Sequence, residues 1–278
     1  MIALNNRIVC LNGQLGNQLF QIALAKYVQT IFNKNVLLVG DLDNHLGELC
    51  NELELEISSC NVRGLYWRPI STLLSSLLAI DSPEQLLTNK QLDKPVLAGY
   101  WQSRHYITNT FLDIYRNWLR VIGRVDSFYS NSGLGLQFDK KFNSSDSACI
   151  QVRLGDFKNT IHDVLTEEYY ASAMSTMYSQ GVRNFFVASN DISQATSMIK
   201  ILGDDLRDIH IEPILGKNYF SDFCLLSNCQ NLIISNSSFG WWAGIDVKNV
   251  IAPRQWYTKG EVNNEFFDPM WNLLDVRT

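Results

Sequence analysis

The sequence predicts an α/β fold made of two Rossmann-like halves. Short apolar runs of strand length alternate with longer segments in which apolar residues recur at helical spacing, and this alternation is typical of parallel, doubly wound sheets. At 278 residues, the chain has room for two domains of ordinary size. Its 46% hydrophobic and 18% charged residues indicate a chain that buries a core and folds.

The first half begins with the strand–loop–helix–strand order of a Rossmann-like unit. The predicted strands are 7–11, 36–39 and 95–99, and the predicted helices are 17–31 and 109–123. The stretch 50–93 has apolar helical pieces around 73–78 but no clean alternation. Residues 131–146 are rich in Ser, Asn and Gly, so we place the domain boundary there and predict domains 1–145 and 146–278.

The second half alternates more regularly. The predicted strands are 148–152, 184–188, 209–211, 232–234 and 250–251, and the predicted helices are 166–180, 192–202, 220–229 and 238–245. The apolar residues of 261–274 predict a C-terminal helix that packs back across the domains. This order indicates a second parallel sheet, whose ligands would bind at the carboxyl ends of its strands.

Charge and cysteine usage narrow the class of protein. The net charge is −5, from 23 basic and 28 acidic residues, without a basic stripe, so we expect no nucleic acid partner. The six cysteines are scattered and lack metal-ligand spacing, which favours reduced thiols. Neither a signal peptide nor an apolar run of spanning length is visible, so we expect a cytoplasmic protein, either free or peripheral on the inner face of the inner membrane.

Arg153 is the first candidate for ligand binding. It follows the apolar run 148–152 and therefore lies at the carboxyl end of a predicted strand. A guanidinium is a planar fork of donors that matches phosphate oxygens. The motif from Gln151 to Asp156 therefore predicts either a phosphate clamp or a surface ion pair between Arg153 and Asp156, and the residues alone leave both open.

Two further strand–loop–helix steps carry polar residues. These are Asn236, Ser237, Ser238 and Phe239 after the strand 232–234, and Asn190 and Asp191 after the strand 184–188. Ser and Asn cap the free N–H groups of a helix start, and the same N–H groups bind phosphate. A carboxylate in such a loop can hold ribose hydroxyls or the N–H groups of a base. Capping alone also explains both loops.

The first loop and a nearby acidic pair are weaker signals. Glycines in residues 13–18 permit a close approach of the backbone to an anion, but the full dinucleotide fingerprint is absent. Asp41 and Asp43 match the DxD pattern that holds a divalent metal in many sugar transferases. Three-residue matches are frequent by chance, and the four histidines show no ligand spacing. We therefore expect neither a metal nor a cofactor.

Taken together, these segments resemble the bacterial and animal α-1,2-fucosyltransferase family, glycosyltransferase family 11. Residues 13–23 resemble its GGLGNQ-F-QYA stretch, 99–103 its GY-QS segment, 150–157 its HxRRGDY signature, 186–191 its F-SDD-like segment, and 225–245 give the strongest match. The similar segments occur in the family's order and cover most of the chain, which is more specific than any one motif.

The chain also departs from the family pattern. Gln14 stands where the family usually has Gly, Gln151 replaces the common His, and Leu154 replaces the second Arg. One Arg of the pair therefore remains, as in the related protein O-fucosyltransferases. Gln151 can hydrogen-bond a ligand, but it carries no charge and cannot act as a base.

The resemblance implies a GT-B fold, in which two Rossmann-like domains face a central cleft, with 1–145 on the acceptor side and 146–278 binding GDP-fucose. It implies an inverting transfer, without a metal, of L-fucose from GDP-β-L-fucose to the 2-hydroxyl of a galactose-containing acceptor, such as an O-antigen repeat unit. The implied residues are Arg153 and Asp156 for catalysis, Gly16, Asn17, Gln18, Gln151, Arg153, Asn190, Asp191, Asn236, Ser237, Ser238 and Phe239 for the donor, and Tyr100, Gln102 and Ser103 for the acceptor. Other candidates for the catalytic base are His162, Asp163, Glu167 and Glu168.

Two other functions stay open at this point. A transferase of the same fold could use another nucleotide sugar, and a glycan-binding protein without activity could stack sugars on its 7 Trp and 11 Tyr. If the acceptor is lipid-linked, Trp67, Arg68 and the apolar stretch 73–80 are the segments that we expect to touch the membrane surface.

Overall fold

The computed structural model describes residues 6–58, 78–80, 94–125, 141–155, 160–216, 218–258 and 266–276.

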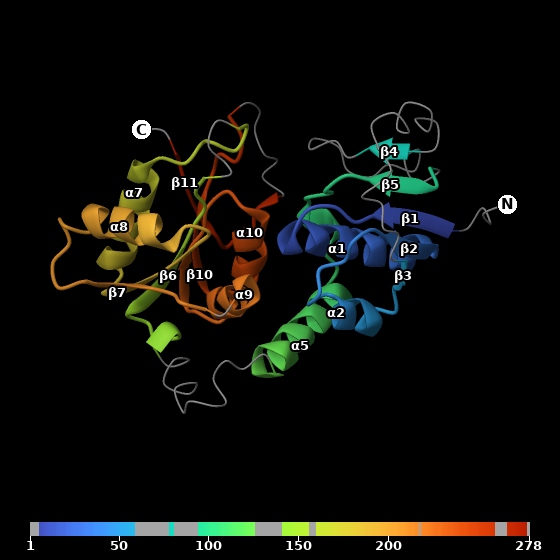
Figure 1. The fold of residues 1–278 in the computed structure, drawn as a ribbon, viewed down its shortest axis with the longest axis horizontal. Helices are drawn as coiled ribbons and strands as arrows, with labels where there is room; N and C mark the ends of the chain where they lie inside the picture. The colour runs from blue at the N-terminus through green and yellow to red at the C-terminus, as the bar shows by residue number, and fades with distance from the viewer. Residues whose placement is uncertain are drawn as a thin grey trace. The chain divides into compact units, whose positions relative to one another are not determined.

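The chain divides into two compact units, each with its own parallel sheet (Figure 1). The first comprises Met1–Val121 and Asn263–Phe266, and the second comprises Ile122–Val262 and Phe267–Thr278. Two parallel α/β domains are what the sequence predicts. The boundary that we predict at residue 145 immediately precedes the first strand of the second sheet, and it stays a prediction.

The first unit holds a five-stranded parallel sheet in the order β3-β2-β1-β5-β4. Its elements are β1 (Asn6–Cys10), α1 (Leu15–Phe32), β2 (Asn35–Val39), α2 (Gly47–Glu52), β3 (Glu56–Ser58), β4 (Leu78–Ile80), β5 (Val96–Ala98), the 3₁₀ helix η2 (Arg104–Tyr106) and α5 (Asn109–Val125). The central strand β1 pairs with β2 on one side and β5 on the other. The loops after these three strands therefore meet at one edge of the sheet.

The predicted strands and helices of the first half are confirmed, but β3 and β4 are missing from the prediction. Leu78 lies in β4, which pairs with β5, rather than in a helical piece. Both missed strands have three residues and lie at the sheet edges. So short a segment shows no alternation that a sequence pattern can detect.

The second unit holds a six-stranded parallel sheet in the order β11-β10-β9-β6-β7-β8. Its elements are β6 (Ser147–Val152), α7 (Glu167–Ser179), β7 (Asn184–Ser189), α8 (Ile192–Leu202), β8 (His210–Pro213), α9 (Tyr219–Ser227), β9 (Asn231–Ile233), α10 (Ser238–Gly244), β10 (Asn249–Pro253) and β11 (Asn272–Leu274). Helices α7 and α8 cover one face and α9 and α10 the other (Figure 1). The strands and helices predicted from 148 to 251 are confirmed, with small shifts at their ends.

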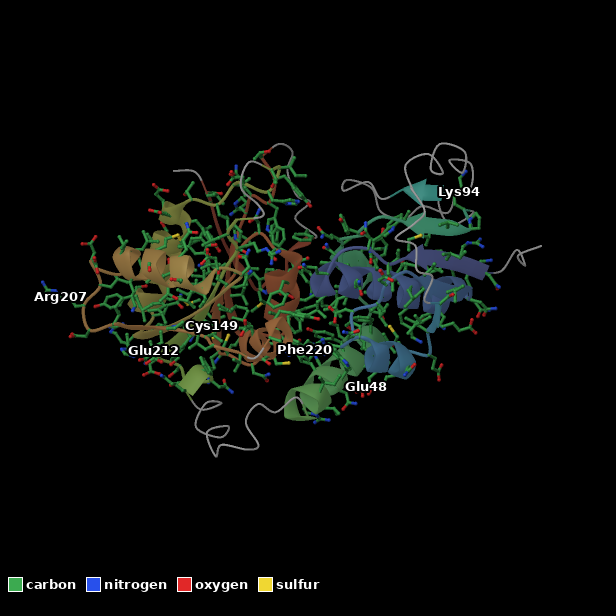
Figure 2. The ribbon with its side chains drawn as sticks, in the orientation of Figure 1. Glu48, Lys94, Cys149, Arg207, Glu212 and Phe220 are labelled. Carbon is green, nitrogen blue, oxygen red and sulfur yellow. The ribbon has the colours of Figure 1, made fainter. Side chains whose placement is uncertain are left out.

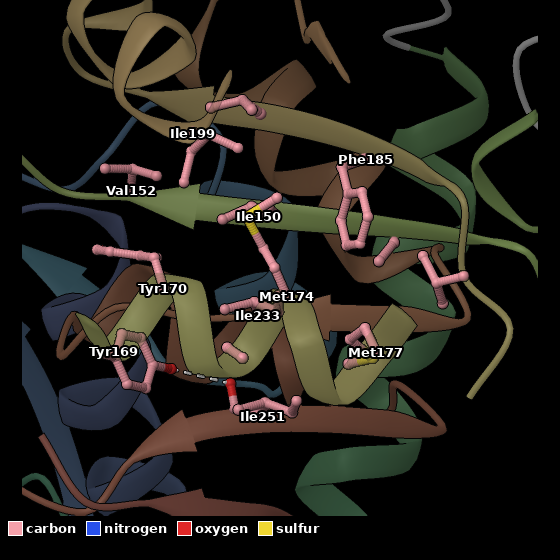
Figure 3. Packing of buried hydrophobic residues seen from close by; sticks show 14 of the residues in the cluster. Ile150, Val152, Tyr169, Tyr170, Met174, Met177, Phe185, Ile199, Ile233 and Ile251 are labelled. Atoms are coloured by element: carbon pink, nitrogen blue, oxygen red, sulfur yellow. Dashed lines mark hydrogen bonds between the residues drawn. The ribbon is translucent and has the colours of Figure 1, made fainter. Parts of the chain in front are cut away.

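Strand β6 is buried along its whole length, which explains its continuous apolar run. Successive side chains point to opposite faces of a strand. Cys149, labelled in Figure 2, faces one side, where its thiol forms a hydrogen bond with that of Cys229. Ile150 and Val152 face the other side and pack with Met174 of α7 in the main core (Figure 3).

The predicted C-terminal helix is wrong for the described residues 266–276. Asn272–Leu274 forms β11, which pairs in parallel with β10. The apolar spacing of this segment fits a helix, but Pro269 has no N–H to donate and the Trp271 N–H closes a turn on the Asp268 carbonyl. The open edge of β10 then offers the remaining residues hydrogen-bond partners that an isolated helical turn would lack.

Candidate active site

Arg153 lies directly after β6, between the loops that follow β9 and β7. Because parallel strands end at one edge of the sheet, these three loops meet around it. The Arg153 side chain is half-buried. Gly155, two residues on, has a φ of 77°, the left-handed region that glycine adopts without strain. The backbone therefore turns at Gly155, two residues after Arg153.

Asn190 fixes the loop that carries Arg153. Its Oδ1 accepts a hydrogen bond from the Leu154 N–H at 2.9 Å, and its Nδ2 donates to the Leu154 carbonyl at 2.6 Å. The side-chain amide thereby extends the β6–β7 pairing beyond Val152 and Ser189. Both ends of the amide bond backbone, so Asn190 positions Arg153; its predicted contact with the donor stays a prediction.

Asp191 caps the next helix. Its side chain accepts a hydrogen bond from the Gln194 N–H at 3.1 Å at the start of α8, and Ser189 Oγ accepts one from the Asp191 N–H at 3.1 Å. Capping is therefore one role of this carboxylate. Its predicted role in holding the donor remains a prediction.

Gln151 is a buried amide whose orientation is fixed by Ser235. Its side chain is 4% exposed, and its Oε1 accepts hydrogen bonds from the Ser235 N–H at 3.0 Å and the Ser235 Oγ at 2.6 Å. Because the backbone N–H can only donate, the oxygen of the amide must face it. The Nε2 donor is therefore turned away from Ser235. A side chain at Gly240 would crowd this arrangement, since its Cβ would lie 2.6 Å from Oε1.

The loop after β9 is held by its own polar residues. Asn236 is 2% exposed, and its Nδ2 donates to the carbonyls of His162 and Trp256, each at 2.9 Å. Ser237 caps α10 by accepting a hydrogen bond from the Phe239 N–H at 3.3 Å. Ser238 is the first residue of this helix. The bonds of Asn236 bring residues 160–164 and the start of α10 together.

Two aromatic residues and one serine support this site and are missing from the sequence prediction. Tyr169 donates from its hydroxyl to the Ile234 carbonyl at 2.6 Å, and a second contact reaches Ile251 at 3.3 Å (Figure 3). Tyr170 is buried beneath the Arg153 backbone, and burial raises its pKa. Ser235 orients Gln151. The available signal is a pair of adjacent tyrosines in the first turn of α7.

The candidates for the catalytic base are spread over two segments. Asp156, the predicted base, lies outside the described residues. His162 and Asp163 lie in the loop that Asn236 ties to α10. Glu167 and Glu168 begin α7, where the hydrogen bond from the Thr166 side chain lowers the pKa of Glu168. A lowered pKa makes a carboxylate a weaker base near neutral pH.

In the first unit, Gln18 binds three backbone groups. Its Nε2 donates to the carbonyls of Gly13 at 3.1 Å and Asp41 at 2.9 Å, and its Oε1 accepts from the Asp43 N–H at 2.8 Å. Gln21, which the sequence prediction lacks, accepts from the Asn12 N–H at 2.9 Å and donates to the Gly99 carbonyl at 2.8 Å. These two amides join the loops after β1, β2 and β5. Polar residues on the buried face of an apolar helix were the signal for them.

Residues predicted for the donor and for the acceptor meet in the first unit. Gln102 donates from Nε2 to Asn17 Oδ1 at 2.8 Å. Gly16, beside Asn17, is buried in the first turn of α1. The Tyr100 side chain is 42% exposed, and Ser103 caps η2 by accepting from the His105 N–H at 3.2 Å. Asn17 and Gln102 therefore belong to one surface.

The DxD pair does not gather further ligands within the described part of the chain. Asp43 Oδ1 accepts from the His45 N–H at 3.1 Å and pairs with its Nδ1 at 3.2 Å. Asp41 contributes its backbone carbonyl to Gln18. Among the described residues, no group of three or more His, Cys, Asp or Glu side chains is arranged to hold a metal ion.

Two parallel α/β sheets, with polar loops at the carboxyl ends of their strands, are the architecture of the GT-B fold. Fucosyltransferase NodZ from Bradyrhizobium shares this fold, with a TM-score of 0.50, 12% sequence identity, and coverage of 87% of this chain and 93% of that chain. The predicted fold class is thereby confirmed.

Residues 84–274 match the family model described as Glycosyl transferase family 11, and the chain belongs to this family. It is 25% identical to the O-antigen biosynthesis glycosyltransferase WbnK of Escherichia coli, over 95% of this chain and 99% of that protein. It is 26% identical to an alpha-1,2-colitosyltransferase of Escherichia coli, over 93% of this chain and 94% of that protein. The family resemblance of the sequence motifs is confirmed.

In the described ranges, no helix has both the length and the apolar character required to cross a bilayer. Trp67 and Arg68, for which we expect membrane contact, lie outside the described residues. The same holds for the apolar stretch 73–80, apart from the backbone of β4.

Proposed function

We propose that this chain is an inverting glycosyltransferase that moves L-fucose from GDP-β-L-fucose to the 2-hydroxyl of a galactose residue in an O-antigen-type oligosaccharide. Membership of the family and similarity to an O-antigen glycosyltransferase support sugar transfer in surface polysaccharide synthesis. The relative named alpha-1,2-colitosyltransferase supports the α-1,2 linkage. The observation that carries the donor site is the position of Arg153 at the end of a central strand, where both ends of the Asn190 amide hold the backbone of the next residue, Leu154.

In this scheme the second unit stabilises the leaving group. Departure of GDP builds negative charge on the β-phosphate, and the Arg153 guanidinium offers it two parallel donors. The N–H groups at the start of α10, behind Ser237 and Ser238, add to this stabilisation. Gln151 contributes a neutral donor through Nε2. Because Leu154 stands where the family has a second Arg, Arg153 shares the pyrophosphate with these neutral groups.

The acceptor hydroxyl loses its proton to Asp156, which follows the clamp by three residues. Its replacement by Asn should lower kcat far more than it raises KM, because the amide cannot take the proton. His162 and Asp163, in the loop tied to α10, are the candidates to compare with it. If Asp156→Asn keeps the wild-type kcat, the base is one of these two.

We assign the acceptor to the carboxyl edge of the first sheet. The bond between Gln102 and Asn17 supports moving Asn17 from the donor site to the acceptor site. Amide groups bind sugar hydroxyls, and the exposed ring of Tyr100 suits the apolar face of a hexose. Gly16, Gln18 and Ser103 then shape this surface through the backbone.

A second candidate donor is the GDP-linked form of colitose, and the colitosyltransferase relative favours it. Colitose is L-fucose without its 3-hydroxyl, so the two donors differ in one polar group. A site that hydrogen-bonds this hydroxyl rejects the sugar that lacks it far more strongly than the reverse. The ratio of kcat/KM for GDP-fucose and GDP-colitose therefore decides between them.

The function is tested with purified protein, labelled GDP-fucose and an array of β-galactosides and O-antigen oligosaccharides, followed by NMR of the product linkage. We expect an α-1,2-fucosylated product. Tighter binding of UDP than of GDP by calorimetry would overturn the donor. Glycan binding that needs no GDP and survives Arg153→Ala, without any transfer, would make the chain a glycan-binding protein instead.

We place the enzyme in the cytoplasm, either free or peripheral on the inner face of the inner membrane, where a lipid-linked acceptor would be reached. Fractionation of cells that express the full chain tests this placement. Recovery in the membrane fraction that is released by high salt supports peripheral binding through charge.

A further inference from the structure

The start of α9 carries a carboxyl group that the proposed mechanism does not use. Asp222 is the fourth residue of this helix, and its Oδ1 is buried without a hydrogen-bond partner in the described chain. Gly216 lies against it, so close that a Cβ on Gly216 would collide with Oδ1. Burial raises the pKa of Asp222 to about 6, and the Gly216 N–H opposes part of this shift without forming a well-aligned hydrogen bond.

The position of this carboxyl group along the sheet fits a nucleotide. Gly216 follows β8, and β8 is two strands from β6 on the side of β7. At about 4.8 Å per strand, the ends of β6 and β8 lie roughly 10 Å apart on one edge of the sheet. A nucleoside diphosphate whose β-phosphate contacts Arg153 extends its base over a distance of this order. The loop of Asn190, which follows β7, lies between these two strand ends.

Two exposed apolar side chains flank Asp222 in the sequence of this loop and helix. Leu215 is 69% exposed and Tyr219 is 47% exposed. Leu215 precedes Gly216, and Tyr219 is the first residue of α9. An aromatic or apolar surface next to a polar acceptor is what a planar base requires, because the ring stacks while its edge forms hydrogen bonds.

We propose that Asp222 binds the edge of a guanine base, accepting hydrogen bonds from N1–H and the exocyclic amine, while Tyr219 and Leu215 cover the ring. Guanine places two N–H donors side by side, which a carboxylate can accept. In adenine, cytosine and uracil, an acceptor atom adjoins the N–H group and is repelled by a carboxylate. The inference rests on the proposed donor site at Arg153 and adds the group that selects the guanine nucleotide.

The test compares GDP with IDP, which differs from it by the missing exocyclic amine, by calorimetry on the full chain. Wild-type protein should bind GDP roughly 10-fold more tightly than IDP. Asp222→Asn should lower GDP affinity by roughly 10- to 100-fold, the effect of losing a charge-assisted hydrogen bond, and bring the two affinities together. Asp205→Asn, an exposed carboxylate in the turn after α8, is the matched control and should change neither.

A second variant keeps the test decisive if Asp222→Asn folds poorly. Tyr219→Ala removes an exposed ring and should weaken GDP and IDP equally, by roughly 10-fold, because stacking does not read the amine. Unchanged affinities in this variant would show that Tyr219 does not stack on the base.

The outcomes separate the subsite from the donor site itself. If Asp222→Asn keeps the wild-type ratio of GDP to IDP affinity, Asp222 only braces the loop of Gly216 and the inference is wrong, although GDP can still be the donor. If wild-type protein binds UDP as tightly as GDP, the proposed donor fails together with the subsite. Loss of GDP affinity in Arg153→Ala with a retained preference for GDP over IDP supports both.

Discussion

Gln18 and Gln151 are buried amides at the carboxyl edges of the two sheets, 3% and 4% exposed, and the protein binds them differently. Gln18 donates through Nε2 to two backbone carbonyls and accepts through Oε1 from a third group. Gln151 accepts through Oε1 from both donors of Ser235. Both ends of the first amide are used to join loops, whereas the second amide is held through its oxygen with its donor turned away from Ser235. An amide whose oxygen and nitrogen both bind the protein is therefore structural, whereas an amide held through its oxygen is a candidate ligand group.

If the carboxyl edge of the second sheet binds the donor, replacement of Arg153 should have the largest effect on activity. Arg153→Ala should lower kcat/KM for transfer from GDP-fucose by roughly 10²- to 10³-fold, because a charge-stabilising donor is lost. Arg153→Lys should recover part of this, since it restores a charge but not the fork. Initial rates at varied GDP-fucose measure both variants.

The control for this change is Arg207→Ala. Arg207 lies in the turn between α8 and β8 and points into solvent (Figure 2). The substitution removes the same charge without touching the candidate site, so kcat/KM should stay within about twofold of wild type. Equal losses in the two variants would mean that Arg153 acts only through net charge.

The different hydrogen bonding of the two amides predicts losses of different size for the same substitution. Gln18→Glu directs a carboxylate oxygen at the carbonyls of Gly13 and Asp41, so the free energy of unfolding should fall by roughly 2–4 kcal/mol. Gln151→Glu keeps both bonds from Ser235 and should cost less. Urea titrations at pH 7 measure both changes.

The stability loss of Gln18→Glu should depend on pH. A protonated carboxyl group can donate to one of the two carbonyls, so the loss in Gln18→Glu should shrink at pH 5. Gln194→Glu, on the exposed face of α8, serves as the control and should stay within about 0.5 kcal/mol of wild type. Identical losses of unfolding free energy for Gln18→Glu and Gln151→Glu would contradict the different roles of the two amides.

The sequence was sufficient for most of the fold because buried strands and amphipathic helices repeat over many residues. In the second unit, β6, β7, β9 and β10 each contain an apolar run followed by a polar loop, and the prediction of these strands follows directly. The sequence pattern did not predict β3, β4 and β11, because three residues at a sheet edge are specified by the strand that they pair with.

The candidate site was predictable as a set of loops but not as a set of roles. Asn190 and Asp191 are adjacent polar residues after β7, yet one holds the Leu154 backbone and the other caps α8. Ser235 reaches Gln151 across 84 positions of sequence. Such partners depend on the sheet order, which no local pattern contains. Asn17 beside Gln102 has the same origin.

Packing against Gln151 predicts a smaller difference in stability, between a crowded glycine and an open one. Gly240→Ala would place a Cβ 2.6 Å from Gln151 Oε1 and 3.1 Å from the Ile234 Cβ, so it should destabilise the protein by about 1–3 kcal/mol. At Gly47, the first residue of α2, a Cβ would meet nothing within 4 Å, and Gly47→Ala should be stabilising by about 0.4–1 kcal/mol. Thermal unfolding of both variants measures the difference. A Gly240→Ala variant as stable as wild type would show that the Gln151 side chain can move away from the added Cβ.

The smallest expected effect concerns Asp222 and pH. Its pKa is raised to about 6, so the folded state holds this proton more tightly than the unfolded state does. Stability contributed by the protonated form is therefore lost as pH rises from about 4 through 6, and Asp222→Asn should gain on wild type over this window. Melting temperatures of the two proteins should coincide near pH 4 and diverge by pH 7, whereas parallel curves would contradict the shift. If the carboxylate binds guanine, saturating GDP should narrow the gap at pH 7, because the ligand then supplies the hydrogen bonds that the buried oxygen lacks.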